Sequence, residues 1–236
     1  MTTHRFFQDI EASNGHIDPA EAHHMRRVLR LTPGDSVIFS DGSGTEWDCV
    51  IRSFDPDMVE IQDKRTLPFS GPKITLIVSA IKPANLELIL EKGTELGVDQ
   101  FVITKTDFSQ IPLDKLTKKQ DRFEKILVAA TKQCERGFIP KLAIVPISEI
   151  NSWKSEENLI GTTQYTADPE LLTKIDLGES VTLFVGPEGG FSEEEYRQFG
   201  QNFTPVTFGL YVLRAETAAI AGATILAQQK LTNVAG

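Results

Sequence analysis

The sequence predicts a two-domain protein of the α/β class, in which a small, mostly β unit precedes an open α/β sheet with helices on both faces. Strand and turn patterns fill the first part of the chain. The stretch "TLPFSGPK" then has the prolines and the glycine of a linker. Beyond it, apolar strands alternate with helical segments. We therefore expect one domain over residues 1–70 and a second over residues 73–236.

The first domain is expected to contain one helix and several strands. The helix lies within "HIDPAEAHHMRRVLRL", because Asp18 can cap its N-terminus and Pro19 fits its first position. The turn "TPGD" leads into the strand "SVIFSD", and "GSG" separates that strand from "TEWDCVIRSF". This pattern predicts a hairpin, and "DPDMVEIQDKR" adds another alternating strand.

The second domain begins with "ITLIVSAI", a nearly continuous apolar run that is typical of a buried parallel strand. The segment "NLELILEKGTELG" predicts a helix that stops at Gly97, and "QFVIT" predicts the next strand. One long helix is expected over roughly 114–136 from its helical spacing of apolar residues. Further strands are "LAIVPI", "NLIGTTQY", "VTLFV" and "PVTF". The last helix, "AETAAIAGATILAQQKL", is rich in Ala and Gly, so we expect it to be deeply packed.

Composition places the chain among soluble globular proteins, with 40% hydrophobic and 24% charged residues. No apolar run approaches the ~18 residues of a membrane span, and the N-terminus lacks a signal-peptide core, so a cytoplasmic location is expected. The net charge of −9 argues weakly against nucleic acid as a partner. Yet the stretch from Lys115 to Lys141 contains eight Lys or Arg residues and only three Asp or Glu residues, and "HHMRRVLR" is also basic. Each cluster fits either a solvated helix face or a phosphate-facing patch.

The segment "LFVGPEGGFSEEE", residues 183–195, joins a strand, a glycine-rich turn and a helix start. Ser192 and Glu195 have the spacing of a capping box. This arrangement usually binds an anion, but Glu188 lies within the turn and would repel a pyrophosphate. The turn also has neither the Lys-Ser/Thr of a P-loop nor the dinucleotide-binding glycine spacing. A tight αβ turn without a ligand is the alternative.

The distribution of histidines limits the chemistry of the second domain. All four histidines lie in the first domain, which disfavours Ser-His-Asp hydrolysis and thiolate-imidazole zinc sites in the second. We expect no metal. Methyl transfer from S-adenosylmethionine fits what remains, because this donor has no phosphate and carries a cationic sulfonium. Its leaving group departs neutral and needs no acid.

Further motifs carry a resemblance to a known family. "GPEGGFS..E" is followed about twenty residues later by "LRAETA" within "FGLYVLRAETAAIAG". The order closely resembles the signature of the SPOUT-class 16S rRNA (uracil-N3)-methyltransferases. The segments "HHMRRVLRLTPGD", "LELILEKGTELGV" and "RFEKILVAATKQCERGFIP" resemble other motifs of that family. The chain departs from the family pattern at Phe123, Cys134 and Tyr211, where the family usually has Trp, Ser and Arg.

The resemblance implies an N-terminal PUA-like β-barrel that holds RNA and a C-terminal α/β domain with a deep trefoil knot. It also implies S-adenosylmethionine as cofactor, a homodimer, and 16S rRNA as substrate, within the assembled 30S subunit. The alternatives are a catalytically inactive RNA-binding SPOUT protein and a SPOUT methylase acting on tRNA.

The resemblance also implies site residues on this chain. The cofactor would lie between three loops, where main-chain groups of Phe208, Leu210 and Leu213 clasp adenine while Gly186 and Gly190 give it clearance. The full cofactor set is Tyr165, Thr166, Gly186, Glu188, Gly190, Phe208, Gly209, Leu210 and Leu213. The arginines expected to contact RNA are Arg27, Arg30, Arg122 and Arg136.

The implied target, N3 of a uridine, lies on the Watson–Crick edge, so the base must be unpaired or flipped out. Arg214 is the residue expected to stabilise the negative charge that develops on the ring oxygens. The alternative is that Arg214 simply pairs with Glu216 or Glu188. Glu188 is a candidate general base on the condition that it is buried.

Overall fold

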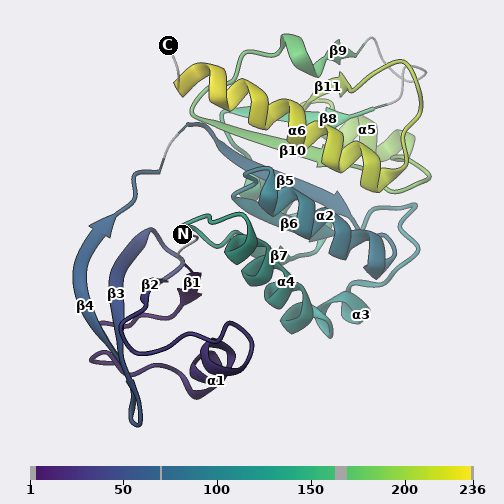
Figure 1. Ribbon diagram of the computed structural model, residues 1–236. Coiled ribbons are helices and arrows are strands. Elements are labelled where there is room, and N and C mark those ends of the chain that lie inside the picture. Colours follow the sequence, from purple (N-terminus) through teal and green to yellow (C-terminus); the bar gives the residue numbers. More distant parts are fainter. Residues whose placement is uncertain (1–3, 70, 163–168, 235–236) are drawn as a thin grey trace. The chain divides into compact units, whose positions relative to one another are not determined.

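The computed structural model describes residues 4–69, 71–162 and 169–234 (Figure 1). The chain divides into two compact units. The first contains Met1–Phe69 together with Thr131–Ile139, and the second contains Ser70–Ala130 together with Pro140–Gly236. The segment 131–139 therefore packs with the N-terminal residues, although it lies within the range that the sequence analysis assigned to the second domain.

The first unit holds a four-stranded sheet in the order β1-β2-β3-β4. Its elements are β1 (His4–Phe7), α1 (Pro19–Arg27), β2 (Ser36–Ser40), β3 (Thr45–Phe54) and β4 (Asp57–Thr66). The pairs β2–β3 and β3–β4 are antiparallel, and β2–β3 is the predicted hairpin. β1 pairs parallel with β2 and was not predicted. The N-cap is confirmed, because Asp18 Oδ1 accepts a hydrogen bond from Ala20 N at 2.8 Å.

The segment 131–139 reaches the first unit through close backbone contacts. Ile139 N donates to the carbonyl of Gly42 at 2.8 Å. Gly44 has a φ of +104°, a conformation that favours glycine, and a Cβ there would lie 2.5 Å from Phe138 Cζ. These long-range contacts explain why a pattern within the segment itself did not reveal its partner.

The second unit contains a seven-stranded sheet in the order β7-β6-β5-β10-β8-β11-β9. All of its neighbouring strands are parallel, which confirms the predicted α/β class. The strands are β5 (Lys73–Ser79), β6 (Gln100–Thr104), β7 (Lys141–Ile144), β8 (Glu157–Gly161), β9 (Glu170–Leu171), β10 (Ser180–Val185) and β11 (Thr204–Thr207). The short β9 was not predicted.

The long helix expected over 114–136 was wrong, because the structure has two helices there, α3 (Leu113–Thr117) and α4 (Gln120–Gln133). The sequence between them contains neither Gly nor Pro, so no local signal marks the break. Leu116 and Phe123, on either side of the break, are both fully buried. The other helical elements are α2 (Pro83–Glu95), η1 (Ile147–Trp153), η2 (Leu172–Lys174), α5 (Glu193–Phe199) and α6 (Ala215–Val234).

Helices cover the sheet of the second unit on both faces. On one face α2 and α6 lie side by side, and α6 contacts β5 and β10 (Figure 1). A Cβ at Gly222 would collide with Leu183 of β10, so the small residues of α6 allow close packing, as predicted. On the other face, Phe184 of β10 packs in a cluster with residues of η1 and α5, such as Ile150 and Phe199.

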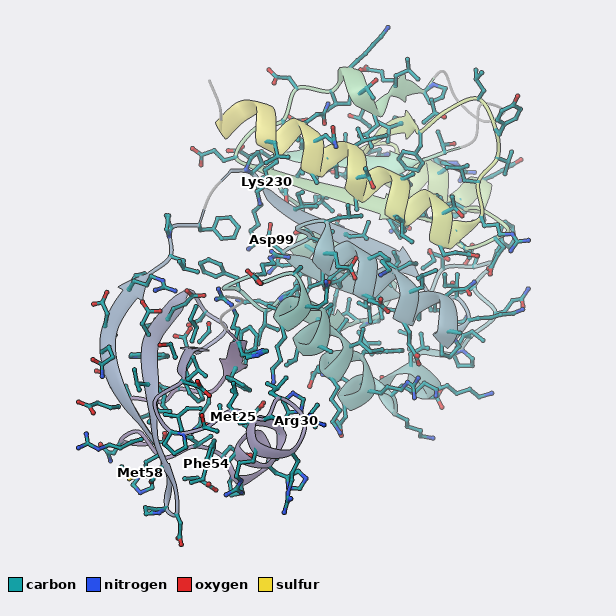
Figure 2. All side chains as sticks on the ribbon, in the orientation of Figure 1. Met25, Arg30, Phe54, Met58, Asp99 and Lys230 are labelled. Carbon is teal, nitrogen blue, oxygen red and sulfur yellow. The ribbon has the colours of Figure 1, made fainter. Side chains whose placement is uncertain are left out.

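The C-terminal end of α6 is anchored to two other segments of the second unit. Lys230 points toward Asp99 (Figure 2), and its Nζ lies 3.5 Å from Asp99 Oδ2. Gln229 Nε2 donates to the carbonyls of Leu172 and Ile175, at 3.2 and 3.1 Å. Residues 172–175, which include η2, therefore lie against α6. The threading of the chain into a trefoil knot stays a prediction.

Candidate active site

The candidate site lies where three neighbouring parallel strands end. In the sheet, β8 lies between β10 and β11. Their carboxyl ends meet at one edge, where ligands bind in open α/β sheets. The residues that follow them include Thr162, the turn Gly186–Gly190 and the loop Phe208–Arg214.

A cavity of about 450 Å³ lies between these segments, a volume typical of small-molecule sites. Its lining includes seven of the predicted cofactor residues: Gly186, Glu188, Gly190, Phe208, Gly209, Leu210 and Leu213. Tyr165 and Thr166 fall outside the described residues. Within the described lining there is no Lys, Arg or His, and Glu188 is the charged member. Such a site disfavours polyphosphate and tolerates a cation.

The glycines of the turn have different structural roles. Gly190 has a φ of +71°, a left-handed conformation that side chains other than glycine rarely adopt. Gly186 approaches Phe191, because a Cβ there would lie 3.0 Å from Phe191 Cε2. Gly209 differs from both, since a Cβ there would meet no heavy atom within 4 Å. Open space at the cavity lining is therefore clearest at Gly190 and Gly209.

The turn is held by the helix cap that follows it. The predicted capping box is confirmed: Ser192 Oγ accepts from Glu195 N, and Glu195 Oε2 accepts from Ser192 N at 2.9 Å. The buried Glu195 also accepts from Asp107 N at 2.9 Å, and Ser192 Oγ donates to Asp107 Oδ2 at 2.6 Å. The loop after β6 is thus fixed to the start of α5, a contact that the sequence analysis missed.

The loop Phe208–Arg214 carries an exposed apolar run. Leu210 is 80% and Tyr211 84% exposed, and Val212 is also exposed. Arg214 is exposed and directly precedes α6, with its carbonyl accepting from Ala218 N at 2.8 Å. Although Leu213 and Ala215 on either side line the cavity, Arg214 itself is not among the lining residues. In the described parts of the chain, no ion pair joins Arg214 to Glu188 or Glu216.

The surroundings of Glu188 and Tyr196 bear on their roles at the site. Glu188 is exposed, so the burial on which its role as a general base depended is not seen in the described structure. Tyr196 was not predicted, yet it lines the cavity, and its hydroxyl forms a hydrogen bond of 3.0 Å with Thr162 Oγ1. The position of Tyr196 within the helix that follows the turn was the available sequence signal.

The four predicted RNA-contacting arginines do not belong to one unit. Arg27, Arg30 and Arg136 lie in the first unit, whereas Arg122 lies in the second. Arg122 forms a bidentate pair with Glu87, with both N–O distances 2.6 Å, and its hydrogen bond lowers the pKa of Glu87. Arg136 is only partly exposed. Arg27 and Arg30 are exposed and form no ion pair with another described residue.

The structure limits other kinds of site as well. Among the described residues, no group of His, Cys, Asp and Glu is arranged to hold a metal ion. No helix in the described ranges combines the length and apolar character that a membrane crossing requires.

Known families match most of this chain. The model of an RNA methyltransferase domain matches residues 69–227, and that of an RNA methyltransferase PUA domain matches residues 17–63. Ribosomal RNA small subunit methyltransferase E of Bacillus subtilis is 28% identical over 234 residues, with 89% of this chain and 88% of that protein covered.

Solved structures are similar along nearly the whole chain. A methyltransferase of Legionella pneumophila in complex with the cofactor SAM is 30% identical, with a TM-score of 0.82 and 96% and 97% of the two chains covered. Ribosomal RNA small subunit methyltransferase E of Neisseria gonorrhoeae, bound to S-adenosyl methionine, is 26% identical, with a TM-score of 0.82 and 98% of each chain covered.

Proposed function

Because the chain belongs to the RNA methyltransferase family, with a PUA domain before the methyltransferase domain, we propose that it methylates N3 of a uridine in 16S rRNA with S-adenosylmethionine. The observation that carries this proposal is the cavity at the carboxyl edge of β10, β8 and β11. Its described lining has glycines, apolar side chains and one carboxylate, and it lacks Lys, Arg and His. These residues suit an adenosine with a cationic sulfonium better than a nucleotide polyphosphate.

The cofactor supplies the methyl group, and the residues of this chain hold it and its target. Gly190 and Gly209 leave room for the adenosine, and the main chain of Phe208, Leu210 and Leu213 is proposed to clasp adenine. Glu188 lines the same cavity, and its negative charge favours a positive charge nearby. No described residue is assigned as the base that removes the N3 proton.

We assign the stabilisation of developing negative charge to Arg214. The first turn of α6 borders the cavity through Ala215 and Ala218. The N-terminus of a helix carries partial positive charge, and Arg214 adds a full charge beside it. Both therefore favour the anionic form of a uracil ring at this end of the cavity.

A homodimer and a substrate within the 30S subunit complete the proposal. The exposed run of Leu210, Tyr211 and Val212 supports a second copy as its cover, because exposed apolar patches mark interaction sites. The requirement for unpaired uridine supports a structured rRNA region in which the base is accessible.

Methylation of purified 30S subunits tests this function. With labelled S-adenosylmethionine, we expect label in 16S rRNA, at N3 of one uridine after mapping by mass spectrometry. Purified tRNA and free 16S rRNA serve as comparison substrates. Label in tRNA instead would support a tRNA methylase, while cofactor binding without labelling any RNA would support an inactive RNA-binding protein.

Charge reversal at Arg27 and Arg30 is expected to weaken RNA binding without affecting the cofactor. Each lost phosphate contact should reduce the salt dependence of binding, because fewer counterions are released. Arg52→Glu/Lys64→Glu is the matched control in the same unit, since both side chains are exposed but already paired with acids. Binding of 16S rRNA at several salt concentrations measures the effect. Equal affinity of the two double variants would remove Arg27 and Arg30 from the RNA surface.

A further inference from the structure

The loop after β6 holds an exposed aromatic side chain next to the candidate site. Phe108 is 50% exposed. It contacts the glycine turn, since a Cβ at Gly189 would lie 3.0 Å from Phe108 Cβ. Gly189 lines the cavity, whereas Phe108 does not. Phe108 therefore lies beside the site without being part of the cofactor cavity.

Hydrogen bonds on both sides of Phe108 hold this loop in place. Thr106 Oγ1 and Ser109 Oγ are 2.9 Å apart and buried, and Ser109 N donates to the Thr106 carbonyl at 3.0 Å. Asp107 is bound to Ser192 and Glu195 at the start of α5. These bonds hold the backbone on both sides of Phe108, so its half-exposed side chain stays beside the glycine turn.

Two exposed cations lie at the same edge of the sheet. Lys105 directly follows β6, and Lys82 comes shortly after the neighbouring strand β5. The two strand ends are adjacent, because Ser79 pairs with Thr104 and Ala80 N donates to the Thr104 carbonyl at 2.7 Å. Neither lysine forms an ion pair with any residue that the structure describes, unlike Lys64 and Lys92.

We propose that Lys82, Lys105 and Phe108, here called the edge platform, bind the unpaired rRNA strand around the target uridine. This proposal rests on the proposed function and names a substrate contact for it. Single-stranded nucleic acid is bound by aromatic rings that stack on bases and by cations that follow the phosphates. In the edge platform, Phe108 stacks on one base, while Lys82 and Lys105 contact the backbone. A base held there stays unpaired beside the cavity.

Substitution of Phe108 tests the stacking contact. Phe108→Ala is expected to lower affinity for a short single-stranded oligouridine on the order of 10-fold or more, whereas Phe108→Trp should stay near the wild type. Fluorescence anisotropy with the full chain measures the affinity. Calorimetry with S-adenosylhomocysteine accompanies it, because Phe108 touches the turn that lines the cavity. Cofactor affinity is expected to stay unchanged.

Substitution of the lysines tests the phosphate contacts. Lys82→Glu/Lys105→Glu is expected to reduce the slope of log affinity against log salt by about 0.7 for each lost contact. The matched control is Lys73→Glu/Lys141→Glu, because those exposed lysines start β5 and β7 at the opposite edge of the same sheet. The control should bind oligouridine more tightly than the platform variant.

Several results would overturn the edge platform. Unchanged oligouridine affinity in Phe108→Ala, or an equal loss in Phe108→Ala and Phe108→Trp, would exclude stacking. A parallel loss of S-adenosylhomocysteine affinity would show that Phe108 acts through the turn, and a change of oligomeric state would show a protein contact instead. Failure of the wild type to methylate 30S subunits would contradict the proposed function, whereas weaker oligouridine binding by Phe108→Ala would still support the platform.

Discussion

Arg214→Ala is expected to lower the rate of rRNA methylation by about 10²–10³-fold, the usual effect of losing one preorganised donor to a developing anion. Arg214 directly precedes α6 at the end of the cavity. Among the described residues, no ion pair with Glu188 or Glu216 neutralises its charge. Because Arg214 does not line the cavity, cofactor affinity should change little. Single-turnover methylation of saturating 30S subunits measures the rate.

Two comparisons determine how Arg214 acts. Arg214→Lys should rescue the rate only in part, since a point charge cannot reproduce the guanidinium fork. Glu216→Gln tests the alternative in which Arg214 acts through an ion pair with Glu216. This variant should methylate at a rate near that of the wild type. Wild-type turnover in Arg214→Ala would remove this residue from the mechanism. A rate loss matched by an equal loss of cofactor affinity in calorimetry would make Arg214 a structural clamp.

Gly209→Val is expected to abolish the thermal stabilisation by S-adenosylhomocysteine. A ligand at about 100 times its Kd stabilises the native state by about 2.7 kcal/mol, which is several degrees in Tm for a chain of this size. Gly209 lines the cavity, and its added Cβ meets no heavy atom within 4 Å, so the variant should fold while its side chain occupies ligand space. Thermal melts with and without the ligand measure the effect, and Gly209→Ala should lose only part of the shift.

Gly190→Val is expected to lose the same thermal shift but also to be less stable without ligand, because Gly190 has a φ of +71°. Gly34→Val is the matched control: Gly34 has a φ of +98°, is equally unobstructed and lies in the first unit. The Gly34→Val variant should also be less stable without ligand, but S-adenosylhomocysteine should still raise its Tm by the full amount. A full thermal shift in Gly209→Val, or tight ATP binding in the wild type, would contradict a cofactor site at this cavity.

Local patterns by themselves determined the class of this protein and most of its candidate site. Apolar strands alternating with amphipathic helices indicate a parallel sheet, and the capping residues Asp18 and Ser192 act within one helical turn. The glycine turn follows β10 directly, so its place at the carboxyl edge was predictable from its neighbours in sequence. The sequence also shows directly that no histidine lies near this turn in the chain.

Only the tertiary structure decided which distant segments meet. The segment 131–139 joins the first unit through Gly44 and Gly42, about ninety residues away in the chain. Glu195 fixes the loop of Asp107, with a separation of 88 residues, and so places Phe108 beside the site. Contacts of this kind depend on shape and packing over the whole fold. No periodicity within either partner records them, because periodicity reports only which face of an element is buried, not what covers it.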